Sequence, residues 1–172
     1  MASTSGNATI AARDLAVVWH PCTQMKDHER LPLIPIARAE GVWLYDFDGK
    51  RYLDALAGLF SVNIGYGHGE EIGQAALEQT RALPFYTNWS YAHPRAIELA
   101  AEVASLAPGD LTRVFFCSGG SEAVESAWKL ARQYFLALGQ RDRVKVISRH
   151  TAYHGATIGA LNITGLDAIK EP

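Results

Sequence analysis

Residues 113–135 read RVFFCSGGSEAVESAWKLARQYF, and this stretch constrains the fold more than any other in the chain. A largely apolar run, 113–117, leads through Ser-Gly-Gly-Ser into a segment of helical periodicity that extends to about Leu138. The connection GQRDR and a second apolar run, 144–148, follow. Strand, helix and strand in this order predict a βαβ unit with a parallel sheet and a right-handed crossover. The predicted fold class is therefore α/β.

Other segments carry local signals of their own. Asp48-Gly49 stands between two strand-like runs, GVWLYD and RYLDAL, and predicts a β-hairpin. The two prolines before the first run suit an edge strand or an extended entry. Apolar periodicity predicts a helix over 72–83, which a proline ends, and another over 94–107, which a proline opens. The small, polar residues 1–12 are expected to be frayed.

Composition excludes several classes of protein. The net charge of -2 over 172 residues gives no reason to expect nucleic acid or an acidic membrane surface as a partner. No run of about 18 apolar residues predicts a transmembrane helix, and the N-terminus lacks the pattern of a secretory signal. Cys22 and Cys117 are far apart, which favours a reducing cytoplasm over a disulfide. The six histidines show no metal-binding spacing.

The glycine turn itself predicts an anion site. Gly119 and Gly120 permit a tight turn and close approach of a ligand to the main chain, and Ser121 adds a hydroxyl. The first N–H groups of the following helix have no intrahelical acceptor and carry the positive end of the helix dipole. A phosphate fits such a place. The competing interpretation is a plain turn with a helix cap, and the turn alone does not decide between the two.

The turn narrows the choice of phosphorylated ligand. It matches neither GxGxxG nor GxxxxGK[ST], so dinucleotide and P-loop interpretations find no support, and a mononucleotide or small phosphorylated cofactor remains. Cys117 stands beside the turn, where a catalytic thiol has to be considered. A buried structural cysteine is the favoured interpretation, because no histidine and carboxylate accompany it.

The helix after the turn is well specified. Glu125 and Lys129 are spaced for an i,i+4 ion pair, and Glu122 in the first turn suits the helix dipole. The expected core face of this helix consists of Ala123, Ala127, Leu130, Ala131, Tyr134 and Leu138.

A second signal follows the apolar run 144–148, at the end of a predicted parallel strand where α/β sheets bind ligands. Tyr153 offers a flat ring, His154 a donor or acceptor, and Gly155 room for close approach. Taken alone, these three residues favour a packed aromatic side chain.

Together the motifs sharpen the interpretation. GSEAVE at a helix start, with Tyr-His-Gly some thirty residues later, resembles the class III pyridoxal-phosphate-dependent aminotransferases. The stretches HPCTQMKDHE, AEGVWLYDFDGKRYLDALAG and NIGYGH are similar to the N-terminal part of that family. The resemblance runs from about Leu15 onward. It implies the fold-type-I architecture, pyridoxal 5'-phosphate as cofactor, and a homodimer with active sites at the subunit interface.

The resemblance also implies roles for particular residues. Gly120 and Ser121 fall where the family holds the cofactor phosphate, and Gly119 occupies a position that is often serine. Tyr153 matches the aromatic residue that stacks on the pyridine ring and borders the substrate, with His154 beside it. On the substrate side, Phe60 lies where many members carry a bulky aromatic residue, frequently tryptophan. A looser match places Trp89, together with Phe85 and Tyr86, near the substrate pocket.

The catalytic residue of the family is expected outside this stretch. The resemblance puts the Schiff-base lysine, and the aspartate that pairs with the pyridine nitrogen, well after the Tyr-His-Gly segment, where the chain has already ended. The expected parallel sheet is also incomplete. The sequence is therefore interpreted as the N-terminal part of a longer enzyme, and the 172-residue piece alone is predicted to be inactive. Residues 1–60 are expected to contribute to a small domain, and 61–172 to begin the large cofactor-binding domain.

The function predicted from the resemblance is transamination between an amine or ω-amino acid and a keto acid such as pyruvate. Phe60 favours this over the diaminopelargonate-forming aminotransferase of biotin synthesis, which the HPCTQMKD stretch also resembles. An aminomutase or decarboxylase of the same cofactor family would share all of these motifs. A non-catalytic phosphate-binding module is the alternative from a different class.

Overall fold

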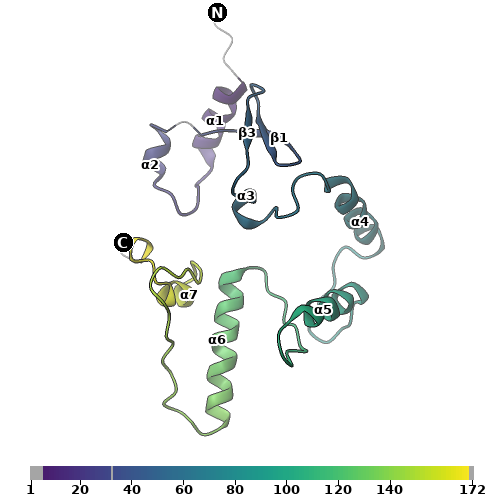
Figure 1. Ribbon diagram of the computed structural model, residues 1–172, viewed down its shortest axis with the longest axis vertical. Helices are drawn as coiled ribbons and strands as arrows, with labels where there is room; N and C mark the ends of the chain where they lie inside the picture. Colours follow the sequence, from purple (N-terminus) through teal and green to yellow (C-terminus); the bar gives the residue numbers. More distant parts are fainter. Residues whose placement is uncertain (1–5, 32, 171–172) are drawn as a thin grey trace, which may run out of the picture. The chain divides into compact units, whose positions relative to one another are not determined.

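A computed structural model describes residues 6–31 and 33–170 (Figure 1). The chain forms two compact units, and the division falls between Thr87 and Asn88. The functional boundary expected between residues 60 and 61 stays a prediction. Within the described residues, no helix combines the length and apolar character needed to cross a membrane.

The first unit contains a three-stranded antiparallel sheet in the order β1-β2-β3. Its strands are β1 (Ile36–Glu40), β2 (Trp43–Asp46) and β3 (Arg51–Leu53). Its helices are α1 (Gly6–Val17), α2 (Met25–His28), α3 (Ala57–Phe60) and α4 (Gly69–Ala82). The helix predicted over 72–83 is confirmed as α4, which begins three residues earlier than the periodicity indicated.

The predicted hairpin is confirmed as β2 and β3. Gly49 takes a positive φ of 84°, which the turn requires and which glycine adopts without strain. The Asp46 carboxylate accepts the N–H groups of Asp48 and Lys50 at 3.0 and 2.8 Å. β1 lies at the edge of the sheet and follows the prolines, as expected, with an irregular register between Ile36 and Arg38.

The expectation that residues 1–12 are frayed is wrong for residues 6–12, which belong to α1; residues 1–5 lie outside the described chain. The reason is a tether that local sequence does not show. Asn7 donates from Nδ2 to Asp46 Oδ2 at 2.9 Å and accepts the N–H of Phe47 at 3.0 Å. These bonds span about 40 residues and fix the start of α1 to the hairpin turn.

In the described residues of the second unit, the regular elements are all helices. It contains α5 (Pro94–Leu106), α6 (Gly120–Ala137), α7 (Ile158–Ile163) and the short 3₁₀ helix η1 (Asp167–Ile169). α5 and α6 confirm the two predicted helices to within about a residue at each end. At the start of α5, His93 Nδ1 accepts the N–H of Arg95 at 3.1 Å. α7 and η1 were not predicted.

The parallel strands expected over 113–117 and 144–148 do not form in the described part of the chain. Both segments lack ladder hydrogen bonds, because neither pairs with the other and no described strand adjoins them. A β-strand is stabilised by its neighbour, so apolar sequence alone does not make one. Burial follows the same pattern: among the described hydrophobic residues, only Ala160 is fully covered.

Candidate functional site

The glycine turn lies at the N-terminus of α6, as the sequence predicted. Gly119 is the N-cap residue, with extended backbone and no capping side-chain hydrogen bond. A Cβ added to Gly119 or Gly120 would meet nothing within 4 Å, so the main chain of the turn is open on that side. Glu122 folds back to accept the N–H of Ser118 at 2.8 Å. The remaining N–H groups at the helix start have no i−4 carbonyl to bind.

The structure brings this turn into direct contact with the Tyr-His-Gly segment. Ser121 Oγ accepts the N–H of Ala156 at 3.0 Å, so its own proton is left to donate elsewhere. Gly155 is buried with φ of 137°, and a Cβ there would collide with Ser121 Oγ and lie 2.8 Å from Ala160 Cβ. The close approach expected of Gly155 is thus made by the protein's own Ser121. The bond between Ser121 and Ala156, which are 35 residues apart, thus joins the two motifs in one junction.

A buried threonine closes the segment that carries Tyr153. Thr164 Oγ1 accepts the N–H of His154 at 3.0 Å and lies 3.2 and 3.0 Å from the carbonyl oxygens of Gly155 and Ala160. The ends of the loop are joined by two backbone bonds: the Thr151 N–H donates to Gly165 O at 2.8 Å, and the Gly165 N–H donates to Ala152 O at 2.7 Å. Residues 151–165 therefore form a compact platform beside the start of α6 (Figure 1). No sequence pattern indicated the role of Thr164.

Glu125 fastens this platform to α6. Its Oε1 accepts the hydroxyl of Thr157 and the N–H groups of Gly159 and Ala160, the latter two at 2.9 and 3.3 Å. The expected ion pair with Lys129 is wrong, because no described salt bridge joins the two and the carboxylate is turned toward α7 instead. The hydrogen bond from Thr157 and those from the α7 backbone lower the pKa of Glu125, and Lys129 adds a weaker effect.

A prediction about pH follows from this carboxylate. Because the pKa of Glu125 is lower in the folded state than its ordinary value of 4.5, its stabilising contribution is complete above pH 4.5 and is lost as pH falls through the folded value. Glu125→Gln should therefore lower the thermal midpoint of the enzyme at pH 7 and have a smaller effect near pH 4. Glu98→Gln, which breaks the exposed Arg95–Glu98 pair, serves as control and should change little at either pH. An equal effect of Glu125→Gln at both pH values would contradict the assignment.

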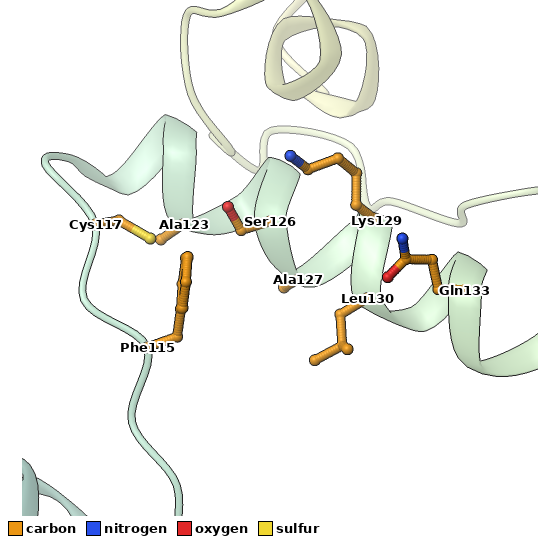
Figure 2. Close-up of a pocket in the computed structure, with 8 residues that line it drawn as sticks. All are labelled: Phe115, Cys117, Ala123, Ser126, Ala127, Lys129, Leu130 and Gln133. Atoms are coloured by element: carbon orange, nitrogen blue, oxygen red, sulfur yellow. The ribbon is translucent and has the colours of Figure 1, made fainter. Parts of the chain in front are cut away.

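Three of the six residues predicted for the core face of α6, Ala123, Ala127 and Leu130, line an open hollow of about 490 Å³. Figure 2 shows Phe115 and Cys117, on the segment before the turn, facing the first turns of the helix. Leu130 also lines the hollow and is exposed, so this face is uncovered in the described chain. Cys117 makes no described hydrogen bond with a histidine or carboxylate, and its surroundings give no support to a catalytic thiol.

The remaining predicted residues lie in several places. The Tyr153 side chain is 58% exposed on the platform, next to His154, which is half-buried. Trp89 belongs to the loop before α5 and is 92% exposed. Phe60 belongs to the first unit, where it ends α3 and is 73% exposed. The structure joins Ser121 to the Tyr153 segment; the substrate-facing roles of Phe60 and Trp89 stay predictions.

Phe60 is held in an unusual backbone conformation that the sequence did not indicate. Residues 57–60 all have positive φ, between 50° and 63°, and form a left-handed helical turn. For a residue with a side chain, such a conformation costs roughly 1–2 kcal/mol. Three of the four residues are not glycine. A strained turn of this kind persists only where surrounding contacts hold it.

Comparison with known proteins identifies the family. The sequence model of the class III aminotransferases matches residues 24–171. The chain belongs to this family. A protein of Mycobacterium tuberculosis named "Probable aminotransferase Rv3329" is 56% identical over 137 residues, which are 80% of this chain and 29% of that protein. The putrescine–pyruvate aminotransferase of Pseudomonas aeruginosa is 43% identical over 137 residues, 79% of this chain and 30% of its own length.

Solved structures agree with the sequence relatives. An (S)-enantioselective ω-transaminase from Thermomicrobium roseum superposes with a TM-score of 0.90 at 45% identity, over 98% of this chain and 38% of that one. The ω-transaminase of Pseudomonas jessenii in complex with PMP gives 0.89 at 36% identity, over 94% and 36%. The family and α/β fold type I predicted from the sequence are thereby confirmed. This class III aminotransferase chain spans about a third of the length of the relatives it matches.

Class III aminotransferases use pyridoxal phosphate, and the residues at the start of α6 fit its phosphate. The two glycines leave open space over the main chain, the Ser121 hydroxyl proton is available, and α6, with 18 residues, is long enough to have a substantial dipole. Glu122 occupies the N–H of Ser118 and so leaves those of residues 119–121 for an anion. The fit therefore rests on main-chain donors and one hydroxyl.

Proposed function

We propose that this chain supplies the cofactor-holding part of an aminotransferase acting on amines or ω-amino acids. The amino group would pass to a keto acid such as pyruvate, in a homodimer of the cytoplasm with active sites at the subunit interface. The observation that carries the proposal is the junction of Ser121 with the Tyr153 segment, in a member of the class III family. The names of two relatives support it. One is the putrescine–pyruvate aminotransferase, and the other is an ω-amino acid–pyruvate aminotransferase of Pseudomonas putida that is 33% identical over 171 residues.

Each of the predicted site residues has a role in this proposal. Gly119, Gly120 and Ser121 would hold the phosphate with N–H groups and a hydroxyl. Tyr153 would cover one face of the cofactor ring, with His154 beside it, because Thr164 and Glu125 hold the platform at the helix start. Bound there, the cofactor supplies an electron sink for the substrate carbon. Phe60 and Trp89 would line the space for the amine.

The diaminopelargonate-forming alternative keeps one supporting observation. An adenosylmethionine-8-amino-7-oxononanoate aminotransferase of Geobacter sulfurreducens is 38% identical over 160 residues. The relatives that use pyruvate include one of higher identity, the putrescine enzyme at 43%. We therefore place pyruvate-dependent transfer first. The purified enzyme is expected to form alanine from pyruvate when putrescine is the amino donor. It is not expected to aminate 8-amino-7-oxononanoate with adenosylmethionine as the donor.

A matched pair of serine variants tests the phosphate assignment. In the intact enzyme that contains these residues, Ser121→Ala should raise the dissociation constant of pyridoxal phosphate on the order of 10-fold, because a hydrogen bond to a charged group is lost. Ser126→Ala changes the same residue type on the same helix, but at the hollow, and should leave it unchanged. The measurement is a cofactor titration followed by absorbance. Equal effects of the two variants would contradict the assignment.

A further inference from the structure

The left-handed turn at residues 57–60 is held by one carboxylate. Asp54 Oδ1 accepts the N–H of Leu56 at 3.0 Å, and Oδ2 accepts the N–H of Gly58 at 2.9 Å. The turn is closed by the bond from Phe60 N–H to Leu56 O at 2.9 Å and that from Ser61 N–H to Ala57 O at 2.8 Å. Asp54 thus binds the main chain as the turn begins, where the backbone enters the left-handed region.

The carboxylate is itself fixed by Tyr66. The Tyr66 hydroxyl donates to Asp54 Oδ2 at 2.7 Å, across twelve residues. The Tyr66 main chain is anchored in turn, because its N–H donates to Gly41 O at 2.8 Å, in the turn between β1 and β2. This packing is tight: a Cβ on Gly65 would lie 2.8 Å from the same carbonyl oxygen. The anchor therefore runs from the sheet through Tyr66 and Asp54 to the turn.

The charge states suit a permanent hydrogen bond. The bond from Tyr66 is the main cause that lowers the pKa of Asp54, and the same bond raises the pKa of Tyr66. Asp54 therefore stays ionised, and the Tyr66 hydroxyl keeps its proton, throughout the neutral pH range. At the far end of the turn, Leu59 and Phe60 are exposed, so their directions depend on the backbone and not on packing of their own.

We propose that Asp54 and Tyr66 are positioning residues for substrate selection: their hydrogen bond fixes the left-handed turn and thereby the direction of the Phe60 ring. The inference rests on the proposed function, in which Phe60 borders the amine. It adds two residues that do not touch the substrate themselves. Selection between slim and bulky amines then depends on a hydrogen bond behind the pocket wall.

The test compares two tyrosines in the intact enzyme. Tyr66→Phe removes only the hydroxyl that binds Asp54. Tyr52→Phe removes a hydroxyl that donates to Asp46 at 2.9 Å in the same unit, away from the turn, and is the control. The readout is kcat/KM for 1-phenylethylamine divided by that for putrescine, with pyruvate as acceptor. Tyr66→Phe should raise this ratio on the order of 10-fold, since one charge-assisted hydrogen bond is lost; Tyr52→Phe should leave it within about twofold.

A double-mutant cycle identifies the route of the effect. In the Phe60→Ala background, Tyr66→Phe should add less than about a twofold change, because the ring that it positions is gone. Suppose that Phe60→Ala alters the ratio. The positioning role would then be overturned if Tyr66→Phe alone left the ratio unchanged, or if its effect were undiminished in the Phe60→Ala background. If Phe60→Ala itself left the ratio unchanged, the proposed place of Phe60 at the amine would fail first. Asp54→Asn, which weakens the same anchor from the acceptor side, should shift the ratio in the same direction as Tyr66→Phe.

Discussion

A polypeptide of these 172 residues alone should form no detectable alanine when it is supplied with pyridoxal phosphate, putrescine and pyruvate. Transamination of this kind needs a lysine that bonds to the cofactor and moves a proton at the substrate carbon. Within the second unit, no described hydrogen bond or ion pair joins a lysine to the glycine turn. Lys129 follows Gly120 by nine residues along α6, which is about 13 Å of helix. Lys145 lines a hollow beside the C-terminal half of the same helix.

The same experiment has a direct chemical readout. After borohydride reduction in the presence of the cofactor, the intact mass of the 18.8 kDa chain should show no pyridoxyl group at a single lysine. A longer chain that continues this sequence should show one such group and form alanine. Turnover that rose in proportion to the amount of verified 172-residue chain would contradict the prediction and move the catalytic lysine into this segment.

The parts of the fold that the sequence predicted are those with local signals. Pro94 at the first turn of α5 and Asp48-Gly49 in the hairpin act within a few residues of themselves, and both elements formed where expected. The start of α1 depends on Asn7 bonds to residues 46 and 47, about 40 positions away. Strand formation over 113–117 depends on a partner strand that the described chain lacks. Sequence patterns predict contacts over such distances poorly, because spatial neighbours leave no periodicity.

The candidate site shows the same limit. The glycine turn and the Tyr-His-Gly segment could both be found as motifs, and the family resemblance supplied their order. Their direct contact through Ser121 and Gly155 could not be predicted, since it depends on how α7 folds back on α6. Glu125 was misassigned for this reason: i,i+4 spacing indicated Lys129, whereas three donors on residues 157–160 satisfy the carboxylate better than one exposed ammonium.

The largest loss of cofactor binding from a single substitution in the intact enzyme is expected for Gly155→Ala. The added Cβ would collide with Ser121 Oγ and lie 2.8 Å from Ser121 Cβ, so the turn and the platform would have to separate. Such overpacking costs roughly 1–3 kcal/mol, and a side chain in this backbone region costs about as much again. If this free energy is lost from cofactor binding, the dissociation constant of pyridoxal phosphate should rise by about 100-fold.

Gly139→Ala separates collision from backbone strain. Gly139 also has positive φ, 76°, in the same unit, but a Cβ there would meet nothing within 4 Å. This variant should lower stability by roughly 1–2 kcal/mol, through strain alone, and leave cofactor affinity unchanged. A cofactor titration and a thermal midpoint should be measured for both variants. Equal cofactor affinity in Gly155→Ala and Gly139→Ala would mean that the phosphate turn does not depend on its contact with the Tyr153 segment, and that the two motifs act separately.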